Sequence, residues 1–181
     1  MSPHVPLVPS PCLQAPTGSF LYAKIKYMEF LSKSVEETAK IASNFAKATL
    51  DKADFANTAT VVGLYGELGS GKTTFMKYLA ESFGIKETIQ SPTFVIEKIY
   101  ELENLSVQIS KHFQHLIHID AYRIEKEEEI INLGWNEITS DPKNLICIEW
   151  PEQIFGIMPE HIRINFEHSD KESERKIKIA P

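Results

Sequence analysis

Residues 66–73 have the sequence Gly-Glu-Leu-Gly-Ser-Gly-Lys-Thr, which matches the pattern G-x-x-x-x-G-K-[ST] of a phosphate-binding P-loop. Glycines adopt backbone conformations that are closed to other residues, so successive N–H groups can point toward one anion. A helix after the loop would add its positive N-terminal end. We therefore expect Lys72 to contact the β- and γ-phosphates of a nucleoside triphosphate and the Thr73 hydroxyl to bind magnesium.

The segments on both sides of this motif have the patterns that a P-loop requires. An apolar, β-branched run at 58–65 predicts a buried strand before it, and residues 72–83 predict an amphipathic helix after it that ends at Gly84. Residues 34–37 resemble a capping box at the start of an earlier helix. Further strands are predicted at 94–100, 116–119, 145–148, 162–166 and 176–179.

The order of these elements predicts the fold class. Strands and helices alternate in the first half of the chain, which favours a parallel sheet covered by helices. We expect an α/β, P-loop NTPase-like fold whose mainly parallel sheet is flanked by helices and extended by antiparallel C-terminal strands. Residues 101–113 lack a firm pattern, and we expect a hairpin there. Residues 125–133 predict an exposed helix that ends at Gly134.

The composition fits one domain that does not hold nucleic acid by its own charge. The 181 residues carry a net charge of −6, whereas nucleic-acid phosphates are bound by Lys and Arg. Cys12 and Cys147 lie far apart, which argues against a disulfide framework or a zinc site and is typical of a cytoplasmic protein. We expect the proline-rich residues 1–27 to be a disordered extension and residues 28–181 to form a single P-loop ATPase domain.

Asp120 and Glu149 each follow a short apolar run and are candidates for the second carboxylate that a P-loop enzyme needs near magnesium. Both would lie at the C-terminal edge of a parallel sheet, where the ligands of α/β proteins bind. We expect Glu149 to be linked to magnesium and Asp120 to orient water or a switch segment. An acid that merely faces solvent at a strand end is the alternative for either residue.

The loop Ser-Pro-Thr at 91–93 offers the Thr93 hydroxyl at the position of a P-loop switch, although a simple turn into a strand has the same pattern. Phosphoryl transfer usually uses an arginine to neutralise charge, and of the three arginines only Arg123 is near a motif. The arginine-rich lid of small-molecule kinases is missing, which favours a regulated ATPase. The alternatives are a small-molecule P-loop kinase, with Asp120 as its base, and a nucleotide-switched binding module without turnover.

Several segments occur in the order and spacing of one family. They are 66–74, 91–94 (Ser-Pro-Thr-Phe), 118–123 (His-Ile-Asp-Ala-Tyr-Arg), 133–134 (Leu-Gly) and 148–152 (Ile-Glu-Trp-Pro-Glu). Together they resemble TsaE, the small ATPase of bacterial tRNA threonylcarbamoyladenosine biosynthesis. The resemblance implies a domain that binds ATP and Mg²⁺, docks onto the TsaB–TsaD pair and hydrolyses ATP to reset the modification enzyme between turnovers. It also implies a requirement in the modification of ANN-decoding tRNAs, with the tRNA contacted indirectly through the complex.

Carried over by position, the resemblance assigns phosphate and magnesium to Lys72 and Thr73 and makes Glu149 the magnesium-linked acid. Thr93 and Asp120 fall in the family's switch-like motifs, and the nucleotide base is expected near Ser34. The predicted catalytic residues are thus Lys72, Asp120 and Glu149, and the predicted metal ligands are Thr73 and Glu149. The predicted nucleotide-binding residues are Gly66, Glu67, Leu68, Gly69, Ser70, Gly71, Lys72, Thr73, Thr74, Ser34 and Thr93.

Overall fold

The computed structural model describes residues 27–50, 57–102, 107–171 and 173–181. Strands and helices alternate along most of this chain, and the P-loop lies between β2 and α3. In chain order the elements are β1 (Met28–Ser32), α2 (Val35–Leu50), β2 (Thr60–Tyr65), α3 (Lys72–Ser82), β3 (Glu97–Glu101), α4 (Val107–His112), β4 (His115–Asp120), α5 (Glu127–Ile131), α6 (Trp135–Ser140), β5 (Asn144–Glu149), η2 (Pro151–Ile157), β6 (Ile162–His168) and β7 (Arg175–Ala180).

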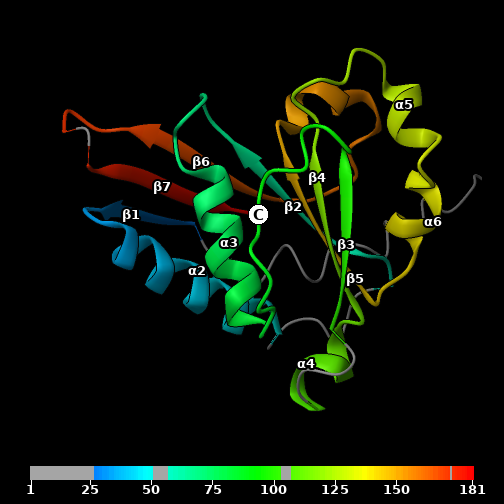
Figure 1. Ribbon diagram of the computed structural model, residues 1–181, viewed down its shortest axis with the longest axis horizontal. Helices are drawn as coiled ribbons and strands as arrows, with labels where there is room; N and C mark the ends of the chain where they lie inside the picture. The colour runs from blue at the N-terminus through cyan, green and yellow to red at the C-terminus, as the bar shows by residue number, and fades with distance from the viewer. Residues whose placement is uncertain (1–26, 51–56, 103–106, 172) are drawn as a thin grey trace, which may run out of the picture.

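One seven-stranded sheet forms the centre of the domain, in the order β1-β7-β6-β2-β5-β4-β3 (Figure 1). Its middle strands are parallel, because β2 pairs in parallel with β5 and β6, and β4 with β5. Both margins are antiparallel, since β7 pairs with β6 and β1, and β3 pairs with β4. This arrangement confirms the predicted α/β class, with a parallel centre and an antiparallel C-terminal strand.

Side chains that alternate along the strands build a core on each face of the sheet. Leu145 and Cys147 of β5 pack in the core that includes residues of α2 and α3. Ile146 and Ile148 pack in the core that includes Ile130 of α5 and a residue of α6. Figure 1 shows these two helix pairs on opposite sides of the sheet. Strands covered on both faces are apolar throughout, which explains why every residue of β5 is buried.

The predicted strands differ from the structure in two places, one in strand pairing and one in where a strand begins. Strand β6 is parallel to β2, in contrast to the antiparallel pairing expected for both C-terminal strands. The reason is that η2 follows β5 and returns the chain toward the opposite edge of the sheet, and such crossovers join parallel strands. Strand β3 begins at Glu97 instead of residue 94, because the N–H groups of Val95 and Ile96 donate to the carbonyl of Pro92 in a turn.

Several elements differ from the sequence-based expectation in type or length. Residues 107–112 form helix α4 instead of one arm of a hairpin, and residues 103–106 lie outside the described residues. The helix expected at 125–133 covers only Glu127–Ile131, and α6 starts directly after Gly134, whose φ is 88°. Strand β1 and helix η2 have no sequence prediction. The predicted disordered extension, apart from Tyr27, lies outside the described residues.

No helix in the described part of the chain is both long enough and apolar enough to span a membrane.

Candidate functional site

The P-loop and both candidate acids lie at one edge of the sheet. Strands β2, β5 and β4 are parallel neighbours, so their C-terminal ends lie together. The loop 66–71 follows β2 and leads into α3, whereas β4 ends at Asp120 and β5 ends at Glu149. Asp120 and Glu149 are direct partners in the register of β4 on β5. The sheet thus carries two carboxylates to the side of the P-loop.

Glycines set the backbone path of the P-loop. Gly66 has a φ of 138°, and a Cβ there would lie 2.4 Å from the carbonyl oxygen of Phe166. Any other residue at this position would therefore force the loop away from β6. Gly71 has a φ of 105° and is the N-cap of α3, so the chain turns into the helix through a left-handed conformation that glycine adopts at little cost.

Lys72 is held within the loop. Its Nζ donates to the carbonyl oxygens of Gly66 and Glu67 at 2.7 and 3.0 Å, and lies 3.8 Å from the centroid of the Trp150 ring. Burial lowers the pKa of Lys72, and nearby carboxylates, Glu149 first, oppose this effect. The ammonium group is thus a cation kept close to the loop backbone, where a phosphate would bind.

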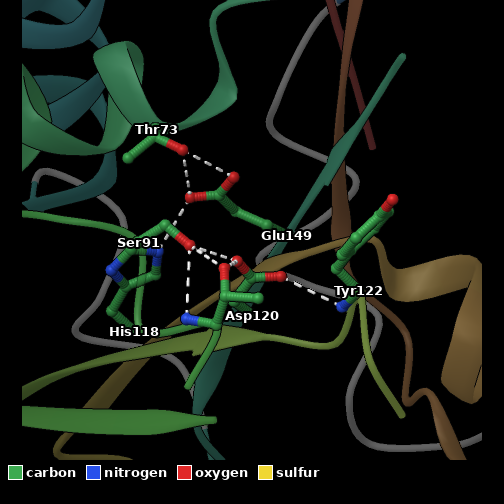
Figure 2. Close-up of polar contacts among 7 residues, drawn as sticks. Thr73, Ser91, His118, Asp120, Tyr122 and Glu149 are labelled. Carbon is green, nitrogen blue, oxygen red and sulfur yellow. Dashed lines mark hydrogen bonds and ion pairs between the residues drawn. The ribbon is translucent and has the colours of Figure 1, made fainter. Parts of the chain in front are cut away.

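Thr73, His118 and Glu149 form a hydrogen-bonded group, here named the Glu149 cluster (Figure 2). Thr73 Oγ1 lies 2.9 Å from both carboxylate oxygens of Glu149. His118 Nε2 lies 3.0 Å from Oε1 of the same carboxylate. His118 and Glu149 are 0% and 2% exposed. The cluster therefore joins the ends of β4 and β5 to the first turn of α3.

Ser91, Thr93, Asp120 and Tyr122 form a second group, here named the Asp120 cluster (Figure 2). The hydroxyls of Ser91 and Thr93 both donate to Oδ2 of Asp120. The backbone N–H of Tyr122 donates to Oδ1 at 3.0 Å, and the N–H of Asp120 donates to the carbonyl of Ile96 at 2.9 Å. Asp120 thus ties the loop between α3 and β3 to the end of β4.

Two cavities meet at the P-loop. The phosphate-side cavity has a volume of about 300 Å³ and is lined by P-loop residues, Trp150 and members of both clusters. The Ser34-side cavity has a volume of about 450 Å³ and lies between the P-loop and the start of α2. Gly69, Gly71 and Thr74 line both cavities, so the P-loop is their common wall. Ser34 also caps α2, since its Oγ accepts from the N–H of Glu37 at 3.3 Å.

The oxygen atoms at the phosphate-side cavity fit a magnesium ion. Thr73 supplies a hydroxyl, and the acidic residues Asp120 and Glu149 are only 3% and 2% exposed. Burying a carboxylate without a cation is costly, so the pair is suited to one. Within the described residues no group of three or more His, Cys, Asp or Glu is arranged to hold a metal alone. A site with so few protein ligands is consistent with Mg²⁺, because proteins usually bind this ion through one or two carboxylates together with substrate phosphates.

Comparison with known families identifies the family of this chain. The family model described as "Threonylcarbamoyl adenosine biosynthesis protein TsaE" matches residues 32–177. The chain belongs to the TsaE family. The matched range includes Ser34, the P-loop and both clusters, and the match confirms the resemblance drawn from the five sequence segments.

Similar TsaE proteins occur in several bacteria. The protein named tRNA threonylcarbamoyladenosine biosynthesis protein TsaE in Bacillus subtilis is 36% identical over 136 residues, which cover 75% of this chain and 74% of that protein. The protein of the same name in Rickettsia conorii is 36% identical over 139 residues, which cover 76% of this chain and 69% of that protein. The Borreliella burgdorferi TsaE is 38% identical over 96 residues, which are 53% of this chain but less than two thirds (63%) of that protein.

A solved structure has the same fold. The crystal structure of Bacillus subtilis YdiB aligns with a TM-score of 0.62 at 31% identity, over 85% of this chain and 84% of that chain. This likeness supports the P-loop NTPase-like class for this member of the TsaE family.

The predicted site residues of this TsaE chain surround the P-loop in two sets. Those that line the phosphate-side cavity are Leu68, Gly69, Gly71, Lys72, Thr73, Thr74, Thr93, Asp120 and Glu149. Those that line the Ser34-side cavity are Ser34, Gly69, Ser70, Gly71 and Thr74. Gly66 and Glu67 line neither cavity, and their carbonyl groups accept hydrogen bonds from Lys72.

Three residues of the site are missing from the predicted sets of catalytic, metal-binding and nucleotide-binding residues. Ser91 binds Asp120 beside Thr93, and its place two residues earlier in the same motif is a usable signal. His118 precedes Asp120 by two residues, which places both on one face of the strand. The ring of Trp150 lies over Nζ of Lys72, and the φ of Trp150 is 60°. The sequence offers no signal for that left-handed backbone at a tryptophan.

Proposed function

We propose that this chain is a magnesium-dependent ATPase that serves tRNA threonylcarbamoyladenosine biosynthesis. The observation that carries the proposal is the 2.9 Å contact between the Thr73 hydroxyl and the buried Glu149 carboxylate. A P-loop hydroxyl and a strand-end acid are the pair that holds magnesium in P-loop NTPases. The process is inferred from the relatives, which are named tRNA threonylcarbamoyladenosine biosynthesis proteins.

The two cavities suit the two halves of ATP. The P-loop N–H groups and Lys72 would bind the triphosphate, with Lys72 exchanging its carbonyl contacts for phosphate oxygens. The larger cavity beside Ser34 is continuous with the P-loop through shared residues and would take the adenosine. Bound Mg²⁺, held by Thr73 and Glu149, supplies charge neutralisation at the phosphates. Asp120 would orient water or the loop that carries Thr93.

A protein partner is part of the proposal. Leu68 and Phe94 lie near the phosphate-side cavity with 74% and 84% of their surfaces exposed, and exposed apolar groups of this kind suit an interface. The guanidinium of Arg123 lies 4.4 Å from the Phe94 ring centroid, and Arg123 is not among the residues that line the cavity. We therefore infer weak hydrolysis by the chain alone and faster hydrolysis with the TsaB–TsaD pair. The net charge of −6 favours indirect contact with tRNA through those proteins.

Nucleotide binding is tested by Lys72→Ala. Because the variant lacks the main phosphate cation, we expect titration of ATP with Mg²⁺, followed by calorimetry, to show at least about a tenfold loss of affinity. Lys77→Ala is the matched control, since Lys77 lies five residues later on α3 with its side chain 43% exposed. Unchanged ATP affinity in Lys72→Ala would contradict a P-loop site.

The reaction is tested by measuring phosphate release at fixed Mg²⁺, with the chain alone and with the TsaB–TsaD pair. Weak release that rises with the pair supports a partner-stimulated ATPase. Tight ATP binding without release, even with the pair, would indicate a nucleotide-switched binding module. Release that does not respond to the pair, together with a phosphorylated small molecule in a metabolite screen, would indicate a kinase.

A further inference from the structure

His118 is a buried histidine that makes one hydrogen bond through its ring within the described residues, to Glu149. The residue is 0% exposed in β4, and its Nε2 lies 3.0 Å from Oε1 of Glu149. Its other ring nitrogen, Nδ1, is buried and has no hydrogen-bond partner among the described residues. A buried polar atom without a partner costs free energy that an apolar side chain of similar size avoids. The contact with Glu149 is therefore the feature that an imidazole supplies here.

The partners of the two ring nitrogens indicate which nitrogen carries the proton. An ionised carboxylate only accepts hydrogen bonds, so Nε2 must carry the proton to bond with Glu149. A bare Nδ1 then leaves only an acceptor unpaired, which native structures tolerate more readily than an orphaned N–H. His118 thus donates from Nε2 to Oε1 of Glu149.

Thr73 alone does not set the orientation of the Glu149 carboxylate. Its hydroxyl lies 2.9 Å from both Oε1 and Oε2, and a hydroxyl has a single proton to donate. The last torsion of a glutamate side chain is intrinsically broad, so this symmetric contact permits rotation of the carboxylate. The bond from His118 reaches Oε1 only, and therefore distinguishes the two oxygens.

We propose that His118 is a positioning residue for Glu149, whose Oε1 it holds so that Oε2 is left to face the phosphate-side cavity. The proposal rests on the proposed ATPase function, in which Glu149 is a ligand of magnesium. Residues that orient a metal-binding carboxylate act through geometry, and their loss usually costs about 10- to 100-fold in activity or metal affinity.

Two variants separate positioning from packing. His118→Gln can offer a side-chain N–H to Glu149, whereas His118→Phe fills the space without a donor. We expect His118→Phe to lower kcat for ATP hydrolysis by about 10- to 100-fold with little change in KM, and His118→Gln to recover much of that loss. Thermal unfolding should rank the variants differently, because Phe lacks the buried, unpaired Nδ1 of His118 and Gln keeps a buried amide. A kcat that follows the unfolding temperature, or a wild-type kcat in His118→Phe, would overturn the proposal.

A measurement without nucleotide tests the same bond in the wild-type chain. Long-range ¹⁵N–¹H correlation spectra of histidine-labelled protein should show His118 protonated on Nε2 and bare on Nδ1. In Glu149→Ala we expect the Nε2 proton to exchange faster with solvent, because its acceptor is gone. A proton on Nδ1 of the wild type would overturn the proposal even if both His118 variants fail to fold. Absence of ATP hydrolysis by the wild type, alone and with partners, would instead contradict the proposed function and leave this result standing.

Discussion

Asp120 and Glu149 are carboxylates at the ends of neighbouring parallel strands, and they hold different parts of the molecule. They are direct register partners and are 3% and 2% exposed. Glu149 contacts Thr73 on the first turn of α3 and His118 on β4. Asp120 contacts Ser91 and Thr93 in the loop that leads to β3. One acid thus belongs to rigid elements around the P-loop, and the other to a connecting segment.

This difference indicates how one sheet edge supports two roles. A group fixed by a helix and two strands keeps its position whether or not ligand is present, which suits a metal ligand. A group that binds loop hydroxyls changes partner when the loop moves, which suits a switch. The exposed Phe94, directly after Thr93, lies on the loop side and is available to a partner.

Substitution at Glu149 should lower activity more than substitution at Asp120. Glu149→Gln removes the charge from the acid nearest the P-loop hydroxyl, and we expect kcat for ATP hydrolysis to fall at least about 100-fold while ATP still binds. Asp120→Asn keeps hydrogen bonding to the loop and should lower kcat only about tenfold. Steady-state phosphate release and ATP titration measure both variants. Equal losses in kcat would show that the two carboxylates do not divide their roles.

A smaller effect is expected when the Asp120 cluster alone is loosened. The double variant Ser91→Ala, Thr93→Val removes both hydroxyl donors to Oδ2 of Asp120. Hydrogen bonds to charged groups contribute about 1.5–3 kcal/mol, so amide hydrogen exchange at Val95 and Ile96, whose N–H groups donate to the carbonyl of Pro92, should accelerate by at least about tenfold. The matched control is Ser82→Ala, which removes a hydroxyl bonded to the carbonyl of Tyr78 on α3. Protection at Val95 and Ile96 that is unchanged in the double variant would show that Asp120 does not hold the loop.

How well the sequence predicted each part of the site depends on how far apart along the chain the interacting residues lie. The P-loop is local, because its glycines, Lys72 and Thr73 lie within eight consecutive residues. The strands ending in Asp120 and Glu149 were predictable because each is an apolar run covered on both faces. By contrast, the bond from His118 to Glu149 depends on the register of β4 on β5, where a shift by one residue would turn His118 to the other face.

The same reasoning explains the missed elements. Strand β1 is short, and Met28 and Leu31 are exposed at the edge of the sheet, so it has little of the alternation that identifies a strand. It exists because it pairs with β7, which lies almost the whole chain away. The parallel pairing of β6 depends likewise on the path of the chain through η2. The residue pattern of one segment does not show which distant strand that segment pairs with.

Backbone strain at Ile96, next to the Asp120 cluster, gives a third, smaller effect. Ile96 has a φ of 67°, which is unfavourable for a β-branched residue, and its carbonyl accepts from the N–H of Asp120 at 2.9 Å. Ile96→Gly and Ile96→Ala both remove the side-chain atoms beyond Cβ, but only glycine also lacks Cβ and relieves the strain. We expect Ile96→Gly to be more stable to urea than Ile96→Ala by about 1 kcal/mol. Equal stability would indicate that the loop adopts another conformation in solution.

The smallest effect concerns Glu97, the residue that follows Ile96 and pairs with Ile119 of β4. Burial raises the pKa of Glu97, so the folded state binds its proton more tightly than the unfolded state does. The stability contributed by this proton is complete below the ordinary pKa and is lost as pH rises through the raised pKa. Glu97→Gln resembles the protonated form at every pH. We therefore expect urea unfolding to show equal stability for Glu97→Gln and wild type in acid, and higher stability for the variant at neutral pH.

Glu101→Gln, an exposed position on the same strand, is the matched control. If the stability difference between Glu97→Gln and wild type is the same at both pH values, the effect comes from packing. If the difference at neutral pH equals that of Glu101→Gln, Glu97 is solvated in solution.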